Sequence, residues 1–169
     1  MSNAIAMPSA QPSETLQKVT DFFLVKSNQA SRPLTNKKLQ KLAYYAQAWN
    51  LVFNDDVMFK DPIEAWIHGP AIKSLYLKYR EYGYLGIKAS PALPAFDEKI
   101  QNTLDNVWAV YGKYDGNYLE LLTHNEEPWI EARGNAEINE PTNIEIDPTR
   151  MKTFYAKLLS DVQSREATA

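Results

Sequence analysis

The sequence predicts a mainly α-helical, single-domain protein, a helical bundle with a short two-stranded β ribbon. Apolar residues recur at spacings of three and four through most of the chain, as on the buried face of a helix. Only residues 63–67 and 143–146 have the character of short strands. A length of 169 residues suits one domain. We expect that domain over residues 13–163, between a disordered N-terminal segment or tag remnant (1–12) and a disordered tail (164–169).

The first helix is expected from Ser13 to about Ser27. Ser13 is a suitable N-cap, because its hydroxyl can accept a hydrogen bond from a free backbone N–H of the first turn. Glu14 follows in that turn, where the helix dipole favours a carboxylate. The predicted buried stripe consists of Leu16, Val19, Phe22 and Phe23.

The second helix has the clearest signals in the chain. Thr35 is a good N-cap, and Leu34 before it can pack against Leu39 as a hydrophobic staple. Residues 54–56 (Asn-Asp-Asp) end the helix. Its apolar positions widen toward the C-terminal half, so we expect that half to be buried nearly all round. These positions are Leu39, Leu42, Ala43, Ala46, Trp49 and Phe53, with Tyr44, Tyr45, Leu51 and Val52 beside them.

Residues 63–67 alternate and predict a short strand. Ile63 and Ala65 would face one side, and Glu64, Trp66 and His68 the other. The next two residues, Gly69-Pro70, are expected to open a helix, since proline is well tolerated at the first helical position. This helix would end at Gly83 or Gly86.

Five further elements complete the prediction. Helices are expected over about residues 96–111, 117–123 and 128–132, the last ended by Gly134. Residues 143–146 form a possible second strand that can pair with the first. Asp147-Pro148 then starts a final helix. Its predicted core face is Met151, Phe154, Tyr155, Leu158, Leu159 and Val162.

Composition restricts the function. The net charge of −3 argues against nucleic-acid binding by this chain alone, because phosphate recognition needs a basic surface. The absence of cysteine excludes disulfides, thiolate nucleophiles and cysteine-ligated metals. Neither a signal peptide nor a membrane-spanning run is recognisable, so we expect a cytoplasmic protein without membrane contact. Ten Tyr, six Phe and four Trp suit both a thick core and a protein-binding face.

The two histidines leave alternatives open. We interpret His68 and His124 as residues of structure or recognition, since histidine is often partly buried for such reasons. The alternative is a small metal-dependent hydrolase in which Glu64, His68 and His124 hold the metal. No pattern of the His-Glu-x-x-His kind or nucleotide-binding glycine loop supports an enzyme.

Three lysines begin the second helix. Lys37, Lys38 and Lys41 are expected on a solvated face, with an anionic partner as the functional alternative. Lys41→Glu is accordingly expected to weaken partner binding while changing stability by no more than about 1 kcal/mol, as for a surface substitution.

Three blocks of the sequence resemble the SocA-like, Panacea-domain antitoxins, a family also known from phage-associated proteins of the GepA type. The blocks occur in family order: LTNKKLQKLAYYAQAW (34–49), DPIEAWIHGP (61–70) with Leu75-Tyr76 and Tyr82-Gly83, and LTHNEEPW (122–129) with Ala132-Arg133-Gly134. The chain departs from many relatives at Ala43 and Ala48, where they carry a bulky residue and a glycine. Residues 86–96 have no counterpart in the blocks.

The resemblance implies a non-enzymatic antitoxin of a toxin–antitoxin module. Such a protein binds and neutralises a cognate protein toxin encoded beside it, needs no cofactor or metal, and can involve a protease system. A transcription regulator acting with its toxin is a further alternative. The family blocks supply candidates for partner binding or for the family fold: Lys38, Gln40, Lys41, Tyr44, Gln47, Glu64, Trp66, His68, Gly69, Pro70, Tyr76, His124, Pro128 and Trp129.

Overall fold

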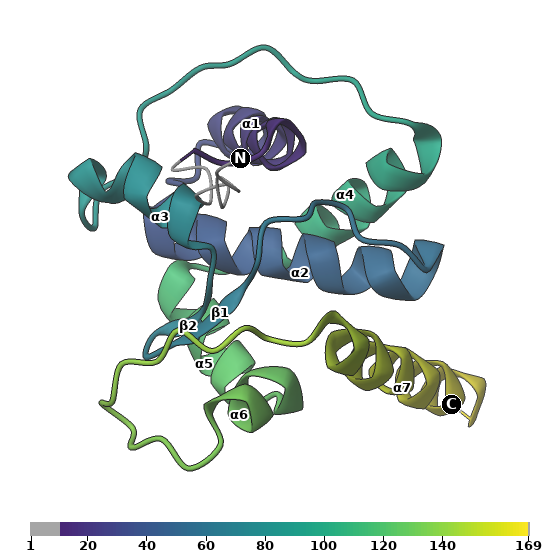
Figure 1. Ribbon diagram of the computed structural model, residues 1–169. Helices are drawn as coiled ribbons and strands as arrows, with labels where there is room; N and C mark the ends of the chain where they lie inside the picture. The colour runs from purple at the N-terminus through teal and green to yellow at the C-terminus, as the bar shows by residue number, and fades with distance from the viewer. Residues whose placement is uncertain (1–10, 169) are drawn as a thin grey trace, which may run out of the picture.

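The computed structural model describes residues 11–168 and confirms the predicted fold class. Within this range the chain forms seven α-helices, one 3-10 helix and a two-stranded antiparallel sheet (Figure 1). The elements are α1 (Glu14–Gln29), α2 (Asn36–Asn54), β1 (Glu64–Trp66), β2 (Gly69–Ala71), α3 (Lys73–Tyr79), η1 (Arg80–Tyr82), α4 (Glu98–Tyr111), α5 (Gly116–His124), α6 (Glu127–Arg133) and α7 (Pro148–Thr168). Residues 1–10 of the predicted N-terminal segment (1–12) lie outside the described residues.

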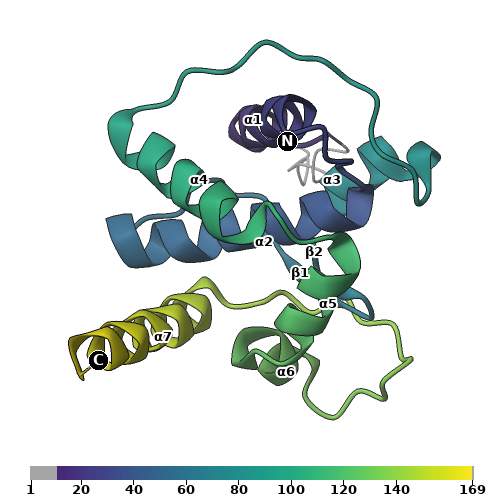
Figure 2. The ribbon, with the colours of Figure 1, turned by 180° about the vertical axis from the view of Figure 1, so that it is seen from behind.

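Helix α2 is the centre of the bundle. Helices α1 and α4 lie on one side of it, and α5, α6 and α7 lie on the other, as the two opposite views show (Figures 1 and 2). Fourteen of its nineteen residues are buried. The buried stretch begins earlier than predicted, because it already includes Lys38 and Lys41, whereas Phe53 near the end is 45% exposed.

The predicted caps of the first two helices are confirmed. The Ser13 hydroxyl accepts a hydrogen bond from the backbone N–H of Leu16, and Thr35 Oγ1 accepts one from Lys38, both at 3.2 Å. At its other end, α2 stops at Asp55, which adopts the left-handed conformation with φ 54°. Each cap satisfies backbone groups that a helix end leaves without partners.

The prediction that Gly69-Pro70 opens a helix is wrong. These residues belong to β2, which pairs with β1 in the register Ala65↔Pro70 and Trp66↔Gly69. Gly69 has φ +103°, a backbone conformation that closes the hairpin and is not helical. The helix begins only at Lys73.

Residues 143–146 also contact β1, on the edge that β2 leaves free. Ala65 N–H donates to the carbonyl of Ile144 at 2.8 Å, and Ile146 N–H donates to that of Ile63 at 2.7 Å. The predicted pairing is thus present as an isolated bridge between Glu64 and Glu145. Because both edges of β1 are covered, its backbone hydrogen bonds are used within the chain.

Helix α7 packs against α2 through its first turns only. Met151 and Tyr155 are buried, but Val162 is 40% exposed, so the predicted core face is wrong at its C-terminal end. The helix continues to Thr168, past residue 163, where we predicted the domain to end. Across residues 11–168, none of the helices has the length and apolarity needed to traverse a bilayer.

Candidate functional site

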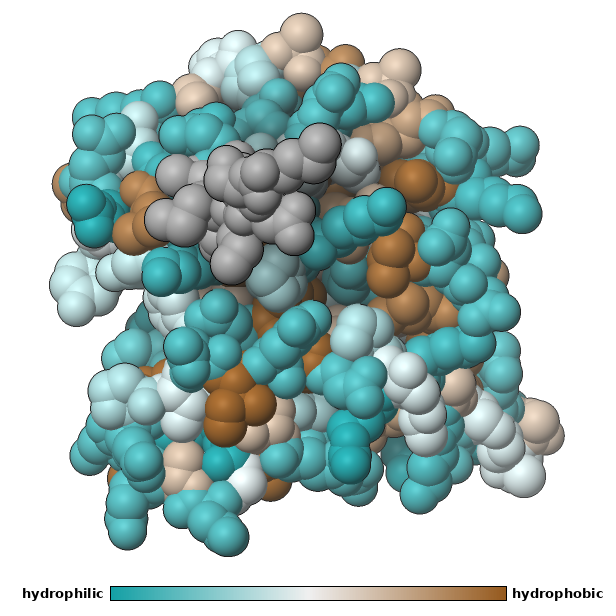
Figure 3. Space-filling model, in the orientation of Figure 1, coloured by the Kyte–Doolittle hydropathy of each residue, from teal (hydrophilic) through white to brown (hydrophobic). Residues whose placement is uncertain are grey.

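A groove of about 930 Å³ opens where the first half of α2, the β1–β2 hairpin and α3 meet. The loop residues 141–143 close one border, and Gly83 and Tyr84 after η1 form another. These elements lie side by side in Figure 1. On the face seen in Figure 3, hydrophobic residues form separate patches among hydrophilic ones.

Half of the fourteen sequence-derived candidates line this groove. They are Gln40, Lys41, Glu64, Trp66, His68, Gly69 and Tyr76. Residues up to 36 positions apart in sequence are brought together here by the packing of the hairpin on α2. The other candidates do not line it: Lys38, Tyr44, Gln47, Pro70, His124, Pro128 and Trp129.

Lys41 lies at the base of the groove and is only 2% exposed. Its Nζ donates a 3.1 Å hydrogen bond to the carbonyl of Pro70, and a Cβ on Gly69 would lie 2.6 Å from Lys41 Cε. Burial lowers the pKa of Lys41 to about 7; Glu120 opposes this shift and Lys37 adds to it. The expectation that Lys41 lies on a solvated face is wrong, and Lys41→Glu would place a carboxylate in the buried space.

Gln40 connects α2 to the end of the hairpin. Its Oε1 accepts a 2.8 Å hydrogen bond from the backbone N–H of Ile72, and its Nε2 donates to Asn36 Oδ1 at 2.9 Å. Asn36 Nδ2 in turn donates to the carbonyl of Tyr76 at 3.1 Å. This chain of amides fixes the position of α3 relative to α2, because buried polar groups are costly to leave without partners.

Trp66 and Tyr76 form the aromatic part of the groove. Their rings meet edge to face, with centroids 5.1 Å apart. The Trp66 indole N–H donates to Glu64 Oε1 at 2.9 Å, and the Trp66 carbonyl accepts from the indole of Trp129 at 2.8 Å. Trp129 therefore holds the hairpin from behind, while Tyr76 remains 39% exposed.

Glu120, which the sequence reading did not select, joins several of the candidates. It accepts hydrogen bonds from Lys37 Nζ at 2.6 Å and meets His68 Nδ1 at 2.7 Å. His124 Nε2 lies 4.0 Å away. Burial acts to raise the pKa of Glu120, but Lys37 and His68 outweigh it, so the pKa is lowered. Glu120 and His124 are four residues apart on α5, but Lys37 and His68 lie more than fifty residues from Glu120, so no local pattern indicates those two contacts.

The metal-site alternative is not supported by this arrangement. His68 and His124 both flank Glu120, whereas Glu64 is engaged by the indole of Trp66. Across residues 11–168, no group of three His, Asp or Glu side chains is arranged so that it could hold a metal ion. His124 stacks on Trp129 at 4.1 Å, and burial lowers its pKa against the pull of Glu120.

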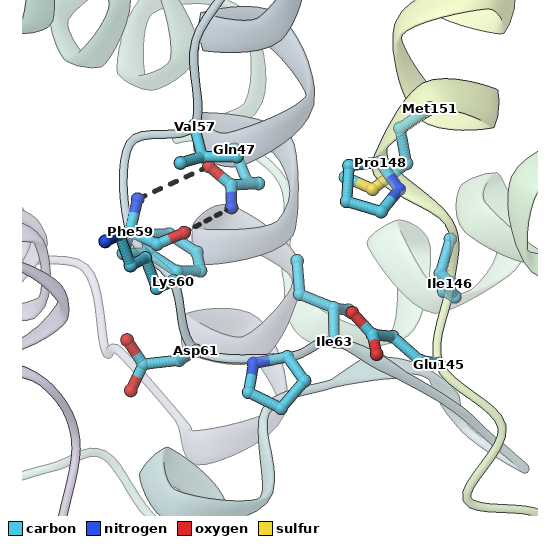
Figure 4. A pocket seen from close by; sticks show the side chains of 11 residues that line it. Gln47, Val57, Phe59, Lys60, Asp61, Ile63, Glu145, Ile146, Pro148 and Met151 are labelled. Atoms are coloured by element: carbon cyan, nitrogen blue, oxygen red, sulfur yellow. Dashed lines mark hydrogen bonds between the residues drawn. The ribbon is translucent and has the colours of Figure 1, made fainter.

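Lys38 and Gln47 hold neighbouring segments in place. Lys38 is 3% exposed, donates to the carbonyl of Gly112 at 2.6 Å, and has its pKa lowered by burial. Gln47 points from α2 toward Phe59 and donates to its carbonyl at 2.7 Å (Figure 4). A second, smaller hollow of about 190 Å³ lies beside Gln47, between residues 57–63 and the start of α7.

Eleven of the eighteen groove residues were not among the candidates, and three of these, Lys73, Arg80 and Tyr84, are exposed cationic or aromatic side chains. A sequence signal existed for the first two, since Lys73, Tyr76 and Arg80 are spaced three and four residues apart, as on one helix face. Tyr84 follows Gly83 and is 94% exposed, which no periodic pattern indicates.

Comparison with protein families gives the following match. The sequence model of the family described as "Antitoxin SocA-like, Panacea domain" matches residues 39–130, more than half of the chain. The matched range includes both strands, α3 and most of α2, whereas Asn36, Lys37 and residues 141–143 of the groove lie outside it. No curated protein and no solved structure matches the chain. The chain therefore belongs to the SocA-like antitoxin family with a Panacea domain, and this membership implies the antitoxin role in a toxin–antitoxin pair.

Proposed function

We propose that this protein neutralises a protein toxin encoded beside it by direct binding, and that the groove between α2, the hairpin and α3 is the contact site. The observation that carries the choice of site is the gathering of seven of the fourteen candidate residues around one groove. Residues that a family pattern shares for folding alone would instead be dispersed through the core, as Tyr44 and Lys38 are.

The groove is suited to binding because its polar side chains are already held in place. Lys41 is bonded to Pro70, Glu64 to Trp66, and Gln40 to Ile72. A surface fixed in this way loses little conformational entropy when a partner binds, which favours affinity. The exposed rings of Tyr76 and Tyr84 add the residue type that most often dominates binding energy at protein interfaces.

Co-expression with the neighbouring open reading frame tests the function. The neighbour alone should arrest growth, and this protein should restore it. A neighbour that is harmless, or that still kills beside a soluble and folded form of this protein, would refute the antitoxin role for that pair.

A pair of variants tests the site. Tyr84→Ala removes a fully accessible groove ring and should reduce neutralisation, whereas Val162→Ala on α7 should leave it unchanged. Both side chains are exposed, so melting temperatures should match the wild type. If Tyr84→Ala and Tyr76→Ala both neutralise the toxin as well as Val162→Ala does, the contact site is not this groove.

A further inference from the structure

The groove carries an excess of positive charge in an acidic protein. Three cationic side chains line it, Lys37, Lys73 and Arg80, together with the buried amine of Lys41, against one carboxylate, Glu64. The whole chain has a net charge of −3. A concave surface lined by one sign of charge concentrates its electric field and attracts a partner of the opposite sign.

Two of these cations have no carboxylate partner within the described part of the chain. Lys37 is paired with Glu120 and Lys41 is buried, but Lys73 and Arg80 are exposed and form no ion pair in residues 11–168. They lie on either side of Tyr76 in the sequence: Lys73 is the first residue of α3, and Arg80 is the first residue of η1. The spacing of three and then four residues places a cation, an aromatic ring and a second cation in one row.

Aromatic surface accompanies this row. Trp66 packs edge to face on Tyr76, and Tyr84 is 94% exposed at the border. Such rings bind apolar or aromatic side chains, and arginine commonly joins tyrosine and tryptophan among the residues that dominate an interface. The surface therefore matches a partner that presents carboxylates beside an apolar side chain.

We infer that the groove receives an acidic segment of the toxin, with carboxylates at Lys73 and Arg80 and an apolar side chain against Trp66 and Tyr76. This inference rests on the proposed antitoxin function. A polypeptide fits better than a nucleic acid, because a phosphate backbone needs a basic surface that continues beyond the groove, and the chain as a whole repels it. Arginine also matches carboxylates through paired N–H donors.

Charge reversal at the two unpaired cations tests the inference. Lys73→Glu with Arg80→Glu should weaken binding of the purified toxin, itself inactivated by mutation, at least 100-fold in titration calorimetry. The matched control, Lys157→Glu with Arg165→Glu, makes the same charge change on exposed positions of α7 and should alter the dissociation constant less than threefold. Should the reversed protein fail to fold, Lys73→Gln with Arg80→Gln should still weaken binding at least tenfold.

Crosslinking identifies the segment that enters the groove. A photoreactive benzoylphenylalanine at position 84 should capture a toxin segment that contains Asp or Glu, and changing those residues to Lys should restore binding to the Lys73→Glu, Arg80→Glu protein. Capture of a segment without acidic residues, wild-type affinity of the reversed protein, or displacement of the toxin by a labelled RNA oligonucleotide would overturn the inference. In each of these cases neutralisation by the wild type would continue to support the proposed function, which fails only if the wild type does not neutralise.

Discussion

The hydroxyl of Tyr45 donates a 2.6 Å hydrogen bond to the carboxyl of Glu126 inside the core. Tyr155 Oη lies 3.0 Å from the same carboxyl oxygen and 3.0 Å from Tyr44 Oη. Burial raises the pKa of Glu126, and the two tyrosine hydrogen bonds oppose that rise. The carboxyl of Glu126, the residue that precedes α6, thus connects α6 to α2 and α7. Trp129, which supports the hairpin through its indole N–H, lies on α6 as well.

Tyr45→Phe should destabilise the protein by about 1–3 kcal/mol, because it removes a partner from a buried carboxyl without leaving room for water. The free energy of unfolding in urea measures this. Tyr118→Phe is the matched control, since Tyr118 is 44% exposed, and its effect should stay within about 0.5 kcal/mol. Equal stabilities of the two variants would mean that Glu126 does not depend on Tyr45.

Lys41 should make stability depend on pH in the alkaline range. Its pKa is about 7 in the folded protein and near 10.5 in an exposed lysine, so the unfolded chain binds more protons between these values. Stability from this group is therefore fully present above pH 10.5 and is lost as the pH falls toward 7. Relative to Lys41→Met, the wild type should gain free energy of unfolding between pH 7 and 10.

Urea denaturation of the wild type and of Lys41→Met at pH 7, 8.5 and 10 gives the difference between their free energies of unfolding. The ionisation of tyrosines largely cancels in this difference. Lys157→Met, at an exposed site, is the control and should run parallel to the wild type. A Lys41→Met curve that also runs parallel would show that Lys41 keeps an ordinary pKa after burial.

Gly69→Ala should cost more stability than Gly83→Ala. Both glycines have positive φ, +103° and +56°, a sparsely populated backbone conformation that costs alanine about 1–3 kcal/mol. A Cβ at Gly69 would lie 2.6 Å from Lys41 Cε, whereas no atom lies within 4 Å of a Cβ at Gly83. Thermal unfolding should rank the two variants in this order; the reverse order would show that Lys41 moves aside freely.

The limits of sequence reasoning follow from the range of the interactions. Thr35 was recognisable as a cap because the backbone N–H that donates to its hydroxyl lies only three residues away, at Lys38. Gly69-Pro70 was misassigned, since a helix start and a hairpin both suit glycine followed by proline, and pairing with Ala65 and Trp66 decides between them. The burial of Lys41 could not be predicted, because its partner carbonyl at Pro70 is 29 residues away.

The groove itself was only partly predictable. The blocks that carry the family resemblance supplied seven of its lining residues, but gave no way to separate these from residues that support the core. Glu120 was missed for a physical reason: its partners Lys37 and His68 lie 83 and 52 residues away in sequence. A single acidic residue on a short helix carries no local sign of such contacts.

Glu120→Gln should make the protein less stable near neutral pH and remove part of its sensitivity to acid. Glu120 connects α2, the hairpin turn and α5 through Lys37 and His68. Because its pKa is lowered in the folded protein, its contribution is fully present above pH 4.5 and is lost as the pH falls through the folded value. The loss at pH 7 should be about 1 kcal/mol, since His68 is exposed and screened by solvent.

Chemical denaturation at pH 7, 4.5 and 3.5 should show the wild type and Glu120→Gln converging as the pH falls. Glu131→Gln is the matched control: Glu131 pairs with Arg150 at the surface, where an ion pair contributes little, and its substitution should change stability only slightly at any of these values. The Glu120→Gln protein should also bind the toxin more weakly, because release of His68 loosens the turn that borders the groove. A Glu120→Gln protein as stable as the Glu131→Gln protein at pH 7, with unchanged toxin affinity, would show that the cluster neither holds the hairpin nor shapes the groove.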